Sequence, residues 1–284
     1  MIVVHTIADC RRERANLGRV ALVPTMGALH AAHVQLMQRA REHAEHVAVS
    51  IFVNPTQFAP HEDFNKYPRP IERDLELCRE AKVDLVFNPT PEEMYREGNG
   101  SQIVIDLPHL TGVLEGRWRP THFRGVCQVV GKLFNIVQPQ AALFGQKDYQ
   151  QLRVLTAMVE QLNWPIEIIP CPTLRDGDGL ALSSRNQYLT PPQRTKALSI
   201  SRGLFAAQAA FNGGERKAEA LVAMVERSIQ KEVGVSDVPV AIDYIAAVDA
   251  LTLEPLKTLT TRFVIAVAAK VGTTRLIDNV VLEP

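Results

Sequence analysis

The sequence has no long apolar run and no surplus of charge of either sign. No stretch approaches ~18 uninterrupted apolar residues, which argues against a membrane-spanning helix. Lysine and arginine together number 31, as do aspartate and glutamate, so the formal net charge is zero. A large nucleic-acid-binding surface usually brings a basic surplus, and we expect no nucleic-acid partner. Residues 1–5 lack the charged start of a secretory signal, which predicts a cytoplasmic protein.

Cysteine is scarce and scattered. Cys10, Cys78, Cys127 and Cys171 lie far apart and show none of the spacings of a zinc site. A chain of 284 residues with 46% hydrophobic residues can bury a core without disulfides. We therefore expect reduced cysteines that pack in the interior rather than catalytic thiols.

Short apolar runs alternate with helical patterns over about the first 170 residues. Strands are expected at residues 20–23, 47–53, 83–87, 141–144 and 166–169, and helices at 30–46, 71–81, 126–136 and 150–162. Strands rich in valine and isoleucine that alternate with helices predict a parallel sheet covered on both faces. Such sheets bind ligands beyond the carboxyl ends of their strands, so the loops that follow the strands should face one crevice.

The remainder of the chain has a different order of elements. Helices expected at residues 192–211 and 215–233 precede strands expected at 241–248 and 262–271. Helices followed by strands suggest a smaller α+β domain with a largely antiparallel sheet. The boundary falls in the irregular stretch 172–186, and we predict one domain of residues 1–175 and a second of residues 176–284.

The most informative stretch follows the first predicted strand, where the chain passes Pro24 and Gly27 to reach His30 and His33. Residues three apart on a helix share a face, so the two imidazoles should project together from the first turn. The unpaired amides and the positive dipole end of that turn suit a phosphate. The spacing by itself also fits ordinary surface polarity, and a catalytic zinc would need a third protein ligand.

Polar side chains recur after the later strands. Asn54 and Gln57 carry amides that suit a hydroxyl-bearing carboxylate. Gly145 permits close backbone approach, Lys147 could meet a phosphate, and Asp148 could accept a hydrogen bond from a ribose hydroxyl.

Further positive charge comes from residues 117–125, which include His122, and from residues 179–186, in which two serine hydroxyls precede Arg185. Each segment is a weak signal alone, since loops often carry such residues. Together they concentrate positive charge on one expected crevice in a protein of zero net charge. That combination fits ATP better than nucleic acid.

Four segments resemble the pantoate–β-alanine ligase family. They read PTMGALH at 24–30, FVNPTQF at 52–58, FGQKDYQQ at 144–151 and DGLALSSRN at 178–186. The resemblance implies a Rossmann-like N-terminal domain of the HIGH-signature nucleotidyltransferase superfamily, a smaller α+β C-terminal lid domain, and a homodimer. It also implies that ATP and pantoate give a pantoyl adenylate and pyrophosphate, after which β-alanine displaces AMP to form pantothenate, with Mg²⁺ required.

The resemblance further implies the role of individual residues. His30, His33 and Lys147 would be catalytic, contacting the ATP phosphates. Gln57 and Gln151 would hold pantoate. The remaining ATP-binding residues would be Met26, Gly145, Asp148, Leu174, Ser183, Ser184 and Arg185. Asp74 matches an aspartate tied to the magnesium site.

Three positions depart from the family pattern. Ala32 replaces the glycine of His-x-Gly-His, Thr121 replaces a glycine, and Gln146 replaces a glutamate. The added methyl of Ala32 could crowd ATP, so we expect weaker ATP binding than in an Ala32→Gly variant.

Other functions fit parts of the same pattern. A cytidylyltransferase of the same superfamily is one, although the paired amides favour a carboxylate acceptor. A nucleotide-binding protein that has lost catalysis is another, suggested by Ala32 and Thr121. A tRNA synthetase is disfavoured because neither an anticodon-binding domain nor a basic surplus is visible.

Overall fold

The computed structural model describes residues 1–60, 62–95, 103–233 and 238–284, and the chain divides into two compact units. The first unit comprises Met1–Thr111, Arg119–Gln146 and Gln151–Pro172, and the second comprises Gly112–Trp118, Lys147–Gln150 and Thr173–Pro284. Two short segments that precede Thr173 in the sequence thus belong to the second unit. The division into residues 1–175 and 176–284 stays a prediction.

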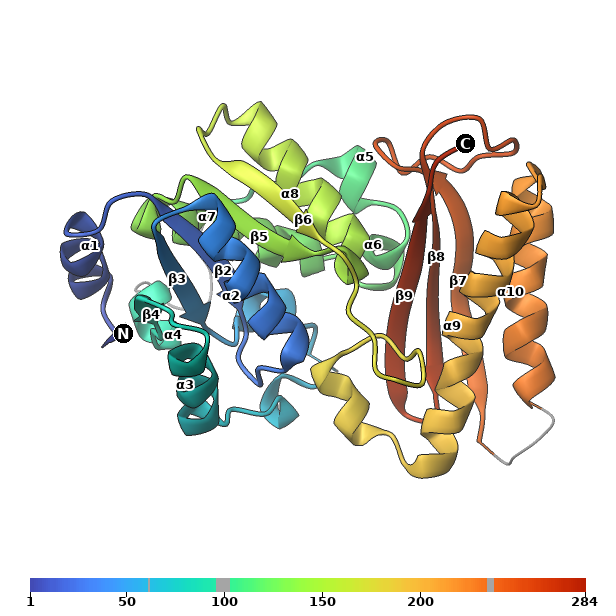
Figure 1. Ribbon diagram of the computed structural model, residues 1–284, viewed down its shortest axis with the longest axis horizontal. Coiled ribbons are helices and arrows are strands. Elements are labelled where there is room, and N and C mark those ends of the chain that lie inside the picture. The colour runs from blue at the N-terminus through green and yellow to red at the C-terminus, as the bar shows by residue number, and fades with distance from the viewer. Residues whose placement is uncertain (61, 96–102, 234–237) are drawn as a thin grey trace. The chain divides into compact units, whose positions relative to one another are not determined.

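The first unit is built on a six-stranded, wholly parallel sheet with the order β1-β4-β3-β2-β5-β6 (Figure 1). The strands are β1 (Ile2–Val4), β2 (Val20–Thr25), β3 (His46–Ile51), β4 (Leu85–Phe87), β5 (Ala141–Gly145) and β6 (Glu167–Cys171). The strand β2 is buried along almost its whole length, which explains why its sequence is a continuous apolar run rather than an alternation of apolar and polar residues. The predicted parallel sheet is confirmed.

The order of this sheet reverses between β2 and β5. The strands β3 and β4 extend the sheet on one side of β2, whereas β5 and β6 extend it on the other. Because the strands are parallel, the carboxyl ends of β2 and β5 lie side by side at Thr25 and Gly145. This is the topological switch point, where open α/β sheets bind their ligands.

Helices cover both faces of the parallel sheet. On one face, α2 (Ala31–His43) and α3 (Ile71–Glu80) pack against apolar residues of β2, β3 and β5. On the other, α7 (His122–Val137) contacts β2 and α1 (Ile7–Ala15). The remaining elements here are α4 (Pro91–Met94), α5 (Pro108–Thr111), α8 (Tyr149–Gln161), η1 (Pro55–Gln57) and η2 (Phe64–Lys66). In the described part of the chain, no helix is long and apolar enough to cross a membrane.

The second unit is a three-stranded antiparallel sheet with two long helices packed on it. The strands β7 (Val240–Asp249), β8 (Phe263–Val271) and β9 (Thr274–Leu282) lie in that order. Their apolar side chains form one core with α9 (Pro191–Asn212) and α10 (Ala218–Val233). Shorter elements are α6 (Glu115–Trp118), η3 (Gln146–Asp148) and η4 (Ser184–Tyr188). This confirms the α+β region with an antiparallel sheet.

Several predicted boundaries differ from the structure. The helix predicted over residues 30–46 ends at His43, and His46 already begins β3. The helix predicted from residue 215 begins at Ala218. Neither α1 nor the strands β1 and β9 were expected.

All four cysteines are free and buried, as the sequence predicts. Burial raises the pKa of the Cys10 thiol to about 11, and that of the Cys78 and Cys127 thiols to about 12. Burial also raises the pKa of Cys171. At neutral pH these thiols are protonated, which fits a packing role.

Candidate active site

A strained turn joins β2 to the histidine-bearing helix. Gly27 and Ala28 both adopt left-handed backbone conformations, with φ of 81° and 50°. The hydroxyl of Thr25 accepts from the Gly27 amide at 3.2 Å and donates to the Ser50 carbonyl at 2.7 Å. These hydrogen bonds fix the backbone at the end of β2 and so direct the chain toward the start of α2.

The carboxylate of Asp74, on α3, holds the same turn. Its two oxygens accept from the amides of Ala28 and Leu29 at 2.8 and 2.7 Å. Asp74 is only 1% exposed, and burial raises its pKa despite these hydrogen bonds. A Cβ added at Gly27 would lie 2.9 Å from an Asp74 oxygen, so glycine is required there for space as well as for φ.

The two histidines lie together at the N-terminus of α2. His30 is the N-cap residue, with extended backbone, rather than a member of the first turn, and His33 is the third helical residue. Their ring centroids are 4.1 Å apart, and the His30 amide donates to His33 Nδ1 at 3.2 Å. Because Nδ1 accepts, a neutral His33 ring carries its proton on Nε2. Such a ring donates from Nε2 beside the helix N-terminus, a place that favours anions.

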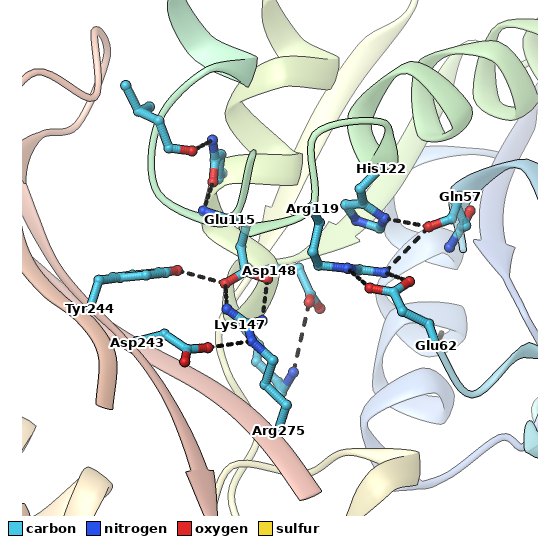
Figure 2. A network of polar contacts seen from close by, with 12 residues as sticks. Gln57, Glu62, Glu115, Arg119, His122, Lys147, Asp148, Asp243, Tyr244 and Arg275 are labelled. Carbon is cyan, nitrogen blue, oxygen red and sulfur yellow. Dashed lines mark hydrogen bonds and ion pairs between the residues drawn. The ribbon is translucent and has the colours of Figure 1, made fainter. Parts of the chain in front are cut away.

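The amide predicted to hold pantoate, Gln57, is itself held from three sides. Its Oε1 accepts from Asn54 at 3.1 Å, and its Nε2 donates to Met26 Sδ at 3.0 Å. Its backbone carbonyl accepts from His122 at 3.0 Å and from Arg119 at 3.3 Å (Figure 2). The structure therefore joins Met26 and Gln57, which the sequence assigned to different substrates.

Asn54 is 1% exposed and makes further hydrogen bonds within the protein. Its amide also donates to the Gly125 carbonyl at 3.1 Å, and its Oδ1 accepts from the Tyr95 hydroxyl at 2.7 Å. A Cβ at Gly125 would lie 2.3 Å from the Thr56 carbonyl, so α7 and η1 touch at a residue without a side chain. Asn54 thus fixes the loop that presents Gln57.

A buried ion pair supports this loop. Glu62 receives two hydrogen bonds from Arg119, at 2.5 and 2.9 Å, and both side chains are less than a fifth exposed (Figure 2). Burial alone would raise the pKa of Glu62, but the hydrogen bonds and charge of Arg119 outweigh it and lower that pKa below 4.5. The sequence indicates positive charge around Arg119, but no local sequence pattern links Glu62 or Tyr95 to Gln57.

In the second unit, Lys147 and Asp148 lie in η3, before α8 begins. Their side chains form an ion pair of 3.7 Å, with Lys147 18% and Asp148 48% exposed (Figure 2). Lys147 lies in η3, before α8 begins, whereas Gln151 lies within α8. At Gly145, two residues earlier, an added Cβ would meet no atom within 4 Å.

Four of the predicted ATP-binding residues, Leu174, Ser183, Ser184 and Arg185, lie between β6 and α9 in the second unit. The Leu182 amide donates to the Leu174 carbonyl at 3.0 Å, and Arg175 pairs with Ala181 as an antiparallel bridge. The Ser183 hydroxyl accepts from the Arg185 amide at 3.3 Å and caps η4. Leu174 is thereby placed beside the segment that carries Ser183, Ser184 and Arg185.

No group of three or more His, Cys, Asp or Glu side chains that could hold a metal ion occurs among the residues that the structure describes. A mononuclear magnesium site with one or two protein carboxylates would not form such a group.

The parallel sheet with a histidine-bearing helix N-terminus at its switch point places the chain among Rossmann-like α/β proteins. Comparison with known proteins narrows this class. Residues 2–281 match the family described as pantoate-beta-alanine ligase. The chain belongs to the pantoate–β-alanine ligase family, a family of enzymes, as its motifs predict.

Relatives match over almost their whole length. The chain is 53% identical over 281 residues to the pantothenate synthetase of Moorella thermoacetica, covering 99% of this chain and 96% of that protein. It is 50% identical over 287 residues to that of Pelotomaculum thermopropionicum, covering 99% of both.

Solved structures agree with the fold. The pantothenate synthetase of Thermus thermophilus superposes with a TM-score of 0.91 at 44% identity, covering 100% of both chains. The pantoate-beta-alanine ligase of Francisella tularensis, solved as a complex with beta-gamma ATP and beta-alanine, gives a TM-score of 0.78 at 32% identity, covering 99% and 97% of the two chains.

Proposed function

We propose that this chain condenses pantoate with β-alanine to form pantothenate, using ATP and passing through pantoyl adenylate. Membership of the family supports the pantothenate-forming ligase reaction. Within the chain, the observation that carries the proposal is the pair His30 and His33 at the N-terminus of α2, beside the switch point of the sheet. Nucleotide phosphates bind at such helix ends.

The first step joins pantoate to the nucleotide. A pantoate carboxylate oxygen attacks the α-phosphorus, the bond from that phosphorus to the β-phosphate oxygen breaks, and pyrophosphate leaves. Negative charge builds on the phosphate oxygens, so fixed positive donors and correct positioning supply most of the acceleration. In our proposal, His33 Nε2–H, the amides at the start of α2 and the ammonium of Lys147 are these donors.

The second step releases the product. The neutral amine of β-alanine attacks the acyl carbon of the adenylate, the bond from that carbon to the phosphate oxygen breaks, and AMP leaves as the nitrogen loses a proton. No protein nucleophile takes part. Because the mixed anhydride reacts with water, the site must exclude solvent between the steps.

The other assigned residues orient the substrates in this proposal. Gln57 and Gln151 hold pantoate, and the fixed orientation of the Gln57 amide supports this role because its Nε2 and Oε1 have defined partners. Asp148 and the Gly145 backbone hold the ribose. Leu174, Met26, Ser183, Ser184 and Arg185 complete the ATP contacts.

In the proposed reaction, Mg²⁺ would bind with ATP as its counter-ion. Asp74 fits a ligand role poorly, because both of its oxygens accept backbone amides and the side chain is 1% exposed. Asp74 instead positions the turn that precedes α2. A homodimer and a cytoplasmic location, both implied by the sequence, stay predictions.

A nucleotide-binding protein without catalysis is the alternative that Ala32 favours, because its methyl stands in the first turn of α2. Pantoate-dependent exchange of labelled pyrophosphate into ATP separates the two. Exchange that requires pantoate supports the ligase, and ATP binding without exchange supports the alternative. Formation of AMP and pantothenate on adding β-alanine would complete the test.

A further inference from the structure

Two segments of the second unit that carry predicted ATP contacts are bonded to neighbouring residues of one strand. Asn279 Nδ2, on β9, donates to the Lys147 carbonyl at 2.8 Å. The adjacent Asp278 forms a bidentate pair with Arg175, at 2.6 and 2.9 Å. Asp278 and Asn279 are 6% and 5% exposed, so these bonds are shielded from water.

The alternation of a strand explains how two neighbouring residues reach different segments. Leu276 and Val280 belong to the core that β9 shares with α9 and α10, so Asp278, between them in register, points to the helix-covered face. Arg175 agrees with this placement, because its guanidinium lies 4.9 Å from the ring centroid of Phe205 on α9. Asn279 points to the opposite face of the sheet.

The face of the sheet to which Asn279 points is also linked, through Glu115, to the other end of the segment Lys147–Gln150. Arg275 lies on the same face of β9 as Asn279 and donates two hydrogen bonds to the Glu115 carboxylate, at 2.6 and 2.8 Å (Figure 2). The Tyr244 hydroxyl also donates to Glu115, at 2.9 Å. The Glu115 amide donates to Gln150 Oε1 at 2.9 Å. The segment Lys147–Gln150 is thus tied to the C-terminal sheet at both of its ends.

Arg175 also contacts the loop that carries Ser183, Ser184 and Arg185. Arg175 donates to the Gly179 carbonyl at 3.2 Å, and its backbone pairs with that of Ala181, two residues before Ser183. The backbone N–H of Asn279 donates to Asp278 Oδ1 at 2.8 Å, which holds the Asp278 carboxylate against the backbone of β9.

We propose that Asp278 and Asn279 are positioning residues that fix the Lys147 segment and the Ser183–Arg185 loop to β9. The inference rests on the proposed function for its catalytic consequence. Neither residue needs to touch a substrate. A strand is a more rigid support than a loop, and bidentate charge-assisted pairs hold orientation as well as distance.

The test compares Asn279→Ala and Asn279→Asp with Asn135→Ala as the matched control. Asn135 also donates its side-chain amide to a backbone carbonyl, that of Gly131 at 3.0 Å, but on α7. Asn279→Asp keeps the shape while turning an oxygen toward the Lys147 carbonyl, so a mere packing role predicts a mild effect for this variant.

Amide hydrogen exchange of the full-length protein gives the first readout. Both Asn279 variants should speed exchange in residues 147–152 by about tenfold or more, whereas Asn135→Ala should leave that segment unchanged. Equal exchange in wild type and both Asn279 variants would overturn the anchoring, whether or not the enzyme is active.

Pyrophosphate–ATP exchange gives the second readout. Asn279→Ala should lower the turnover number by about 10- to 100-fold with the KM for pantoate nearly unchanged, and Asn279→Asp should be worse. Asp278→Asn, which removes the charge that holds Arg175, should raise the KM for ATP. Variants that match Asn135→Ala in an active enzyme would overturn the positioning role. An inactive wild type would instead refute the proposed function, leaving the hydrogen-exchange result to decide the anchoring.

Discussion

At the scale of single residues, one carboxylate decides the geometry of the turn before the histidine helix. Asp74 accepts the amides of Ala28 and Leu29, and these bonds hold Ala28 in a left-handed conformation that an alanine seldom adopts. The sequence shows Gly27 and the histidines plainly. It does not show Asp74 as their partner, because the contact joins residues about 45 positions apart.

Gly27→Ala tests this turn. The substitution places a Cβ 2.9 Å from Asp74 Oδ2 at a φ of 81°, so we expect the free energy of unfolding to fall by about 1–3 kcal/mol. Gly177→Ala is the control, since an added Cβ there meets no atom within 4 Å. Urea unfolding of the two variants measures the difference, and equal stability would show that the turn tolerates a side chain.

Ala32→Gly tests the departure from the family pattern. Removing the methyl from the first turn of α2 should lower the KM for ATP by up to about tenfold if it crowds the nucleotide. The helix itself should lose up to about 1 kcal/mol, since glycine is a poorer helix former. Steady-state kinetics with varied ATP measures the first effect, and an unchanged KM and turnover would contradict the crowding.

At the scale of elements, the strands and helices that can be predicted from the sequence are those with a buried apolar run or a long amphipathic pattern. The strands β2, β3 and β5 were found because each consists mostly of buried apolar residues. The strand β1 has only three residues, and α1 buries only Cys10, so both signals are weak. The strand β9 was missed because Arg275, Asp278 and Asn279 interrupt its apolar pattern, and their partners are distant in the sequence.

The loop that carries Gln57 gives a pH-dependent prediction. Arg119 lowers the pKa of Glu62, so the pair stabilises the fold above the ordinary carboxyl pKa, and this stabilisation is lost as the pH falls through the lowered value. Wild type should therefore exceed Glu62→Gln in stability at pH 7 by about 1–3 kcal/mol, and the gap should shrink as the pH falls below the ordinary carboxyl pKa and through the lowered one. Urea unfolding at a series of pH values measures the gap, and one that stays constant with pH would contradict the coupling.

At the scale of the whole molecule, the contacts group residues that lie far apart in the sequence. The segments Gly112–Trp118 and Lys147–Gln150 belong to the same compact unit as the C-terminal sheet. The buried pair Glu115–Arg275 is one reason, since it joins two elements that lie 160 positions apart. A reading of the sequence in contiguous blocks has no signal for such a grouping.

Glu115→Gln tests how much this pair stabilises its unit. The variant leaves Arg275 with only Asp243 as a charged partner in the contacts seen here, so we expect a loss of about 3 kcal/mol, measured by calorimetric unfolding. Asp9→Asn, in an ion pair at the surface, should leave the melting temperature nearly unchanged. If the two substitutions lowered stability equally, the Glu115–Arg275 pair would stabilise the protein no more than a surface ion pair does.

In the proposed reaction, the pantoate carboxylate attacks the α-phosphorus of ATP. Incubating the protein with ATP, magnesium, β-alanine and pantoate labelled with ¹⁸O in its carboxylate tests this directly by mass spectrometry of the products. We expect one ¹⁸O atom in the phosphate of each AMP released and none in pyrophosphate. Label recovered in inorganic phosphate together with ADP, or AMP without label, would refute attack by the pantoate carboxylate on the α-phosphorus.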